Sequence, residues 1–208
     1  QTFAVTATAR ESDEGRWFLE STSVLPYLDP KICDEALGID QSARLLAHAY
    51  ERIRFLSQAD EDSDAYKWHD LIREGLESRF RAQRPTEYAE VSKRAAKVFD
   101  TRGEVEHALA LLSKAEEYAE GGRLLVRDGE RFLREGRWVF LNRCLEQLPA
   151  EFVDQDAKLL ELRGRMAVRF RDGESAVGYF NNALLCVNSE KAQDRILVAQ
   201  ILINRSFA

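Results

Sequence analysis

Residues 55 to 80 read FLSQADEDSDAYKWHDLIREGLESRF, and this stretch decides how the whole chain is interpreted. Short apolar segments flank the acidic residues 60–64, which is the pattern of two strands joined by a longer loop. From residue 71 onward, apolar residues recur at helical spacing, and Asp70 is expected to cap the start of that helix. The stretch therefore predicts a β-hairpin and then a helix, with His69 at the point where the two meet.

Three helices are expected before the hairpin. They are predicted at residues 16–28, 31–37 and 40–54. Asp29 and Pro30 supply an N-cap and an N1 proline for the second helix, which Gly38 is expected to end. Three helices, a hairpin and a further helix form a winged-helix pattern. We place that domain at residues 16–85, preceded by an N-terminal tail of residues 1–15.

After residue 85 the sequence predicts helical hairpins only. Their helices are expected at residues 86–102, 105–118, 122–135, 138–148, 156–171, 175–187 and 191–207. Gly103, Gly136 and Gly173 lie at the turns with spacings of 33 and 37 residues, which is the period of helical solenoid repeats. The fold class expected is mainly α, with the winged-helix domain followed by a TPR-like superhelix of helical hairpins.

Within this part, we assign residues 86–150 to a helical arm and residues 151–208 to the start of TPR-like sensor repeats. Small and apolar residues take the positions where two tetratricopeptide helices touch: Leu160, Gly164, Ala176, Phe180 and Ala183. Arg171 lies where that template favours a turn glycine. The last helix presents an apolar surface with nothing after it: Ile196, Leu197, Ile201, Leu202 and Ile203. We therefore expect a fragment of a longer array that can self-associate through this surface.

The composition limits the class of protein. A net charge of -6 argues against a general nucleic-acid binder, which needs clustered Lys and Arg. No apolar run approaches the about 18 residues of a membrane span, so no membrane contact is expected. Cys33, Cys144 and Cys186 are widely spaced in apolar helical sequence, which favours buried free thiols in a reducing compartment. We expect a cytoplasmic protein.

No familiar catalytic motif is present. The sequence contains no GxxxxGK[ST], GxGxxG, HExxH or CxxC pattern. His48, His69 and His107 have no Cys or His at metal-ligand spacing, so no metal site is expected. The chain by itself is therefore not expected to be an enzyme.

The winged-helix pattern raises the possibility of DNA binding through residues 41–54. Arg44, Arg52 and Arg54 are candidates for phosphate contacts. The loop that would form the wing tip, however, reads Asp60-Glu61-Asp62-Ser63-Asp64, and its carboxylates would repel the DNA backbone. No direct DNA contact by this domain is expected.

A concentration of basic residues spans the proline at the domain junction. Its members are Arg79, Arg81, Arg84, Lys93, Arg94 and Lys97. A solvated helix face is the favoured interpretation. The alternative is a contact with an acidic neighbouring domain.

His69 has two interpretations on chemistry alone. A histidine beside a helix N-terminus can donate a hydrogen bond to an anion, assisted by the helix dipole and the backbone N–H groups. A structural histidine that caps the helix or bridges the hairpin is the favoured alternative.

The order of several motifs resembles a known family. Trp68-His69-Asp70 resembles the Met-His-Asp motif of STAND signal-transduction ATPases, with Trp68 in place of Met. The surrounding order is closer still to bacterial STAND transcription activators of the LuxR type, a group that includes activators of maltose regulons. The segments that carry this resemblance are residues 18–25 (FLESTSVL), 32–38 (ICDEALG), 94–99 (RAAKVF), 106–109 (EHAL) and 141–149 (LNRCLEQLP).

The resemblance implies a nucleotide-state sensor. In that family the winged-helix domain folds back on an ATPase domain, and the motif histidine contacts the β-phosphate of ADP in the resting state. By carry-over, His69 acts with Trp68 and Asp70 as a sensor without a catalytic role. The fragment itself holds no cofactor, whereas ADP or ATP is implied for the parent protein. The partners expected are that ATPase domain and an inducer or protein on the helical repeats. The alternative function is a free-standing TPR-like scaffold that binds a protein or peptide.

Overall fold

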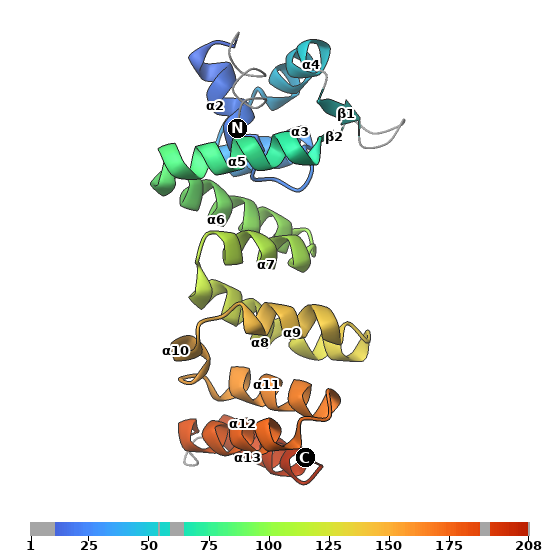
Figure 1. The fold of residues 1–208 in the computed structure, drawn as a ribbon, viewed down its shortest axis with the longest axis vertical. Helices are drawn as coiled ribbons and strands as arrows, with labels where there is room; N and C mark the ends of the chain where they lie inside the picture. The colour runs from blue at the N-terminus through green and yellow to red at the C-terminus, as the bar shows by residue number, and fades with distance from the viewer. Residues whose placement is uncertain (1–10, 54, 59–64, 188–191, 208) are drawn as a thin grey trace. The chain divides into compact units, whose positions relative to one another are not determined.

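The computed structural model describes residues 11–53, 55–58, 65–187 and 192–207 (Figure 1). The chain divides into two compact units, of which the first ends at Glu116 and the second begins at Glu117. The described secondary structure is mainly α-helical, with one two-stranded sheet. This confirms the fold class expected from the sequence.

The first unit contains three helices, a hairpin and three further helices. Its elements are α2 (Asp13–Thr22), α3 (Pro30–Leu37), α4 (Ser42–Arg52), β1 (Leu56–Gln58), β2 (Tyr66–Trp68), α5 (Asp70–Gln83), α6 (Pro85–Thr101) and α7 (Val105–Lys114). The strands pair antiparallel, with Leu56 opposite Trp68. The predicted hairpin is confirmed, and its acidic loop, residues 60–64, lies outside the described residues.

The first helix differs from its prediction at both ends. It begins at Asp13 because Ser12 Oγ accepts a hydrogen bond from the Gly15 amide at 3.1 Å. It ends at Thr22, where the sequence predicts continuation to residue 28. The chain turns here so that Leu28 forms a single antiparallel bridge with Tyr66, through N–H···O bonds of 2.7 and 2.9 Å. The apolar pattern of residues 24–28 therefore reflects a buried turn.

The second helix confirms its prediction. Asp29 Oδ1 accepts hydrogen bonds from the amides of Lys31 and Ile32 at 2.9 and 3.0 Å. Gly38 ends α3 at φ 72°, a left-handed conformation that glycine adopts without a steric penalty. Sequence signals at both ends of this helix were local, so they were sufficient to locate it.

Helix α5 begins where the sequence predicts, but the residue at its N-cap position is not the one expected. Asp70 is the first helical residue, and the N-cap position belongs to His69, whose side chain makes no capping hydrogen bond. The expectation that Asp70 caps the helix is wrong. Its carboxylate lies in the first turn, where it interacts favourably with the helix dipole.

Helix α5 is tied to the helical hairpin that follows it. Glu77 on α5, which is 9% exposed, accepts a hydrogen bond from the Tyr88 hydroxyl of α6 at 3.0 Å. Lys114 at the end of α7 donates to both oxygens of the same carboxylate, at 2.8 and 2.9 Å. The first compact unit therefore joins the winged helix to the α6–α7 hairpin.

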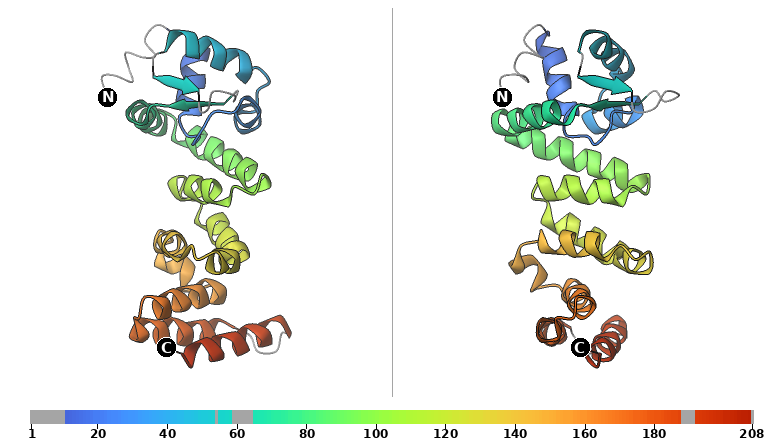
Figure 2. Two further views of the ribbon diagram at one scale, coloured as in Figure 1. Left: turned by 90° about the vertical axis from the view of Figure 1, so that its right-hand side faces the viewer. Right: turned by 45° about the vertical axis from the view of Figure 1, so that its right-hand side comes forward.

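The second unit consists of helices only in its described part (Figure 2). They are α8 (Tyr118–Arg134), α9 (Trp138–Glu146), α10 (Ala150–Val153), α11 (Ala157–Arg169), α12 (Gly173–Cys186) and α13 (Ala192–Arg205). Tyr118 begins α8, whereas the sequence placed it at the end of the preceding helix. The short helix α10 follows Pro149 and was not predicted.

The α11–α12 hairpin has the closest helix contact of this unit. A Cβ atom on Gly164 would lie 2.5 Å from Phe180 Cε1, so only glycine fits at this crossing. The expected contact residues are all buried: Leu160, Gly164, Ala176, Phe180 and Ala183. The turn itself differs from the prediction, because Arg171 takes the left-handed conformation at φ 62° and Gly173 is the first residue of α12.

Helix α13 packs on α11 and α12 (orange to red in Figure 2). Ile201 is fully buried there, which corrects the expectation that the apolar residues of this helix are all uncovered. Ile196, Leu202 and Ile203 remain exposed. Among the described residues, no helix is both long enough and apolar enough to span a bilayer.

The cysteines also depart in part from the prediction of buried thiols. All three are free, but only Cys33 is buried, and burial raises the pKa of its thiol. Cys144 is half-buried, with a pKa raised to about 11 by burial. Cys186 is exposed and is the last residue of α12. Its neighbours in sequence are apolar, but the residue itself does not lie on the buried face of the helix.

Candidate functional site

The candidate site lies where β2 passes into α5. Alternation along β2 turns the Trp68 side chain inward, to 3% exposure, and leaves His69 exposed. The His69 amide donates to the Phe55 carbonyl at 2.9 Å, which extends the hairpin hydrogen bonds by one residue. The strand pairing therefore fixes the backbone that carries the histidine.

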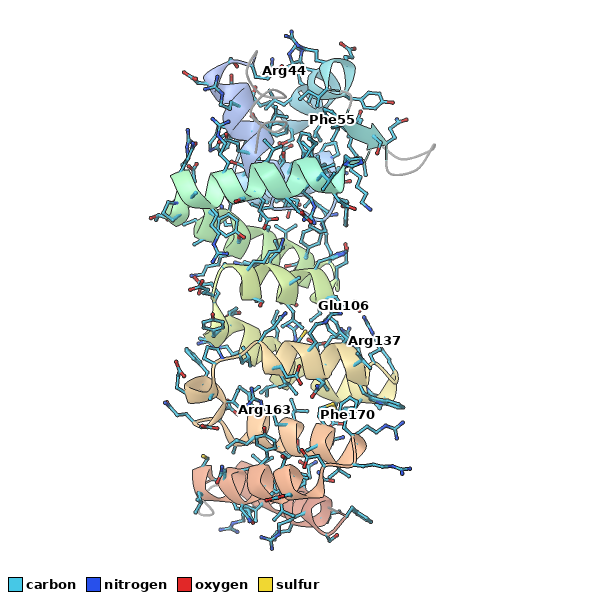
Figure 3. The ribbon with its side chains drawn as sticks, viewed as in Figure 1. Arg44, Phe55, Glu106, Arg137, Arg163 and Phe170 are labelled. Atoms are coloured by element: carbon cyan, nitrogen blue, oxygen red, sulfur yellow. The ribbon has the colours of Figure 1, made fainter. Side chains whose placement is uncertain are left out.

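His69 supports the helix through its backbone alone. Its carbonyl accepts hydrogen bonds from the amides of Ile72 and Arg73, both at 3.0 Å. Its imidazole makes no hydrogen bond in the described part of the chain and lies edge-on to the Phe55 ring, with 6.5 Å between the ring centroids. Phe55, at the start of the hairpin, is labelled in Figure 3. Of the two structural interpretations, the one in which the imidazole caps the helix finds no such contact here, whereas the ring contact with Phe55 is compatible with a histidine that bridges the hairpin.

The other two histidines differ from His69 in their partners. His48 Nε2 lies 3.8 Å from a Glu11 carboxylate oxygen, and His107 Nδ1 lies 3.0 Å from a Glu104 carboxylate oxygen. Within the described residues, His69 is thus the histidine whose ring nitrogens are left for a partner outside the fold.

Two large apolar side chains close to His69 in sequence or in space are exposed. Phe55 is 40% exposed and Leu71 is 73% exposed. Ile72, Leu76 and Phe80 form the buried stripe of α5, so Leu71 projects away from the core. The sequence pattern counts Leu71 with the apolar face of this helix, and its exposure corrects that prediction. Phe55 was not selected as a site residue.

The inward neighbour of His69 carries an unusual polar atom. Trp68 Nε1 is buried and has no hydrogen-bond partner among the described atoms. Its ring packs in the core behind the hairpin, opposite Leu56. Trp68 therefore supports the position of His69 from behind.

The basic residues singled out from the sequence lie on α5 and α6 or, for Arg84, at their junction. Arg79 Nε lies 3.1 Å from the buried Glu20 carboxylate, and Arg81 Nη2 lies 2.9 Å from Glu116. Further contacts join Arg84 to Glu87 at 3.3 Å and Arg94 to the Ala36 carbonyl at 2.9 Å. Lys93 and Lys97 are exposed. An interdomain contact through these residues stays a prediction.

Two of the candidate DNA-contact residues contact neighbouring side chains of the same domain, and the third lies outside the described residues. Arg44 Nη2 donates to Gln41 Oε1 at 2.5 Å, and Arg52 Nε lies 3.5 Å from Glu11. Arg54 and the acidic loop fall outside the described residues. In the part of the chain that the structure covers, no group of three His, Cys, Asp or Glu side chains is placed to hold a metal ion.

Comparison with known proteins agrees with the domain seen here. Residues 7–88 match the family model of the MalT winged helix domain. The match includes the hairpin, His69 and the whole of α5, which confirms the winged-helix prediction.

A longer likeness extends over both units. The HTH-type transcriptional regulator MalT of Vibrio cholerae serotype O1 (strain ATCC 39315 / El Tor Inaba N16961) is 22% identical over 202 residues. The aligned region covers 93% of this chain and 22% of the MalT protein. The chain thus spans about a fifth of the length of the curated relative that it matches.

Proposed function

We propose that this chain is a regulatory segment of a MalT-like transcription regulator, without catalytic activity of its own. In this proposal the winged-helix domain responds to the nucleotide bound by an ATPase domain carried elsewhere in the same protein. The helical units then relay the binding of an inducer or a partner protein. The resemblance of the motif order and the similarity to a transcriptional regulator support this assignment.

The exposed, unbonded imidazole of His69 is the observation that carries the proposal. The fold uses the backbone of this residue and leaves the ring available at the start of α5. A ring N–H there can donate to a phosphate oxygen, and the positive end of the helix dipole favours the same negative charge. The exposed Phe55 and Leu71 can be covered by the domain that carries the nucleotide.

The energy of one such contact is enough for a latch. A hydrogen bond to a charged group contributes about 1.5–3 kcal/mol. If the bond exists only in the closed state, its loss shifts the closed-to-open ratio by roughly 10- to 100-fold. His69 in this role is a sensor residue that biases an equilibrium.

The test is replacement of His69 by Ala in the full-length parent protein. We expect higher basal transcription without inducer and faster release of bound ADP, because the closed state loses a contact. His48→Ala is the matched control, since His48 is also exposed in the first unit but pairs with Glu11. Unchanged ADP release together with unchanged basal transcription in the His69 variant would contradict the proposal.

A further inference from the structure

A pocket of about 380 Å³ lies in the second unit between α8, α10 and α11. Gly122 and Leu159 line it where α8 and α11 approach closely, since a Cβ atom on Gly122 would lie 3.2 Å from Leu159 Cδ1. Tyr118 and Phe152 form an aromatic pair at the pocket, with ring centroids 5.8 Å apart. The volume is at the small end for ligand pockets and suits one side chain or a small molecule of similar size.

The polar lining of this pocket holds two carboxylates, Glu151 and Asp156, together with Arg123, Gln155 and Tyr118. Arg123 donates to Glu120 at 2.7 Å, so its charge already has a partner within α8. Glu151 is exposed at the pocket and carries no such partner in the described part of the chain. Asp156 uses Oδ1 to cap the amides of Lys158 and Leu159 at 2.8 and 3.1 Å, which leaves its second oxygen available.

The segments that form the pocket are acidic as a whole. Over residues 117–123 and 150–159 the carboxylates are Glu117, Glu120, Glu151, Asp154 and Asp156, and the cations are Arg123 and Lys158. This surplus of negative charge disfavours an anionic or phosphate-bearing ligand. It attracts a cation.

We propose that this pocket binds one basic side chain, preferably arginine, from a segment of a partner protein. A guanidinium can stack on the exposed ring of Phe152 while it donates to the Glu151 carboxylate. The methylene groups of the same side chain can lie along the apolar part of the lining beside Leu159. This inference is independent of the nucleotide response, because the pocket residues lie outside the segment matched by the winged helix model.

The test uses the 208-residue chain and two synthetic tripeptides that differ in charge alone. One is acetyl-Gly-Arg-Gly-amide, and the other carries citrulline in place of arginine. We expect the arginine peptide to cause saturable NMR shifts in the amides of residues 118–123 and 151–159. The citrulline peptide is expected to bind about tenfold more weakly, because its neutral ureido group cannot form an ion pair with the carboxylates or a cation–π contact.

Two variants locate the binding site. Glu151→Gln and Phe152→Ala are each expected to weaken binding of the arginine peptide by about tenfold. Glu174→Gln and Phe170→Ala are the matched controls, because both residues are exposed in the second unit away from the pocket, and they are expected to bind like the unaltered chain. Equal binding of the two peptides, shifts spread over the whole acidic surface, or no saturable shift would each overturn the proposal.

Discussion

Lys114 Nζ lies 2.8 and 2.9 Å from the two carboxylate oxygens of Glu77, although the two residues are 37 positions apart. The pair joins the last turn of α7 to the middle of α5. Because Glu77 also accepts the Tyr88 hydroxyl, one buried carboxylate connects three helices of the first unit. Burial of the Tyr88 hydroxyl, together with the charge of Glu77 and the hydrogen bond to it, raises the pKa of Tyr88.

Replacement of Glu77 is expected to destabilise the first unit. Glu77→Ala leaves the Tyr88 hydroxyl without its acceptor and should lower the free energy of unfolding by about 2–3 kcal/mol. Urea unfolding followed by tryptophan fluorescence in a Trp138→Phe background measures this, because Trp17 and Trp68 then report on the first unit. Glu74→Ala, an exposed carboxylate on the same helix, is expected to change stability by less than about 0.5 kcal/mol. Equal effects of the two substitutions would contradict the role given to Glu77.

Two glycines of the α11–α12 hairpin are expected to respond in opposite directions. Gly164→Ala places a methyl group against Phe180 and should cost about 1–3 kcal/mol. Gly178→Ala, on α12, meets nothing within 4 Å and should stabilise the helix by up to about 1 kcal/mol. Thermal unfolding followed by circular dichroism separates the two outcomes. If Gly164→Ala left the unfolding temperature unchanged, the close crossing would not exist in solution.

The turn between α11 and α12 can be stabilised. Arg171 occupies the left-handed region at φ 62°, where a residue with a side chain is strained by roughly 1–2 kcal/mol. Arg171→Gly should therefore raise the free energy of unfolding by about 1 kcal/mol, since part of the gain is lost to the greater freedom of glycine when unfolded. Gly136→Ala, at φ 73°, should lower it by a similar amount. Chemical denaturation of both variants gives the comparison.

The second unit is expected to lose stability as the pH rises above the ordinary range of a glutamate. Burial raises the pKa of Glu161 above its usual value of 4.5, although Arg165 and the Asn204 side chain act in the opposite direction. The folded state therefore holds the proton more tightly than the unfolded state. From pH 4.5 upward to the raised pKa, the free energy of unfolding should fall with increasing pH.

A glutamine at this position tests that dependence. Glu161→Gln keeps an acceptor for Asn204 Nδ2, which lies 2.8 Å from Glu161 Oε1, and removes the titration. We expect a flatter stability profile above pH 4.5 than in the unaltered chain. Glu146→Gln, exposed on α9, is the control and should leave the slope unchanged. An identical slope in all three proteins would show that Glu161 does not control it.

Local signals predicted much of the fold. Asp29 and Gly38 located α3 because a cap acts on the residues next to it. The end of α2 escaped prediction because the chain turns there to reach Tyr66, a partner far away in sequence. The α11–α12 turn was misplaced because a glycine is the usual left-handed residue, whereas here Arg171 adopts that conformation.

The sequence predicted where His69 lies in the fold, but it did not predict the environment of its side chain. The strand pattern and the helix start placed His69 correctly between β2 and α5. The use of its backbone as the cap, with the imidazole left exposed, depends on the ψ angle of 130° at this residue, which the sequence does not encode in a recognisable motif. The exposure of Phe55 depends in turn on how the hairpin packs.

The Leu28–Tyr66 bridge has a consequence for synthesis of the chain on the ribosome. Val24, Leu25 and Leu28 are buried in the finished domain, yet the backbone partner of Leu28 is made only when residue 66 has been added. A contact that spans so many residues delays folding until the later segment is available. The apolar turn that contains Leu28 therefore stays without its strand partner until Tyr66 is available.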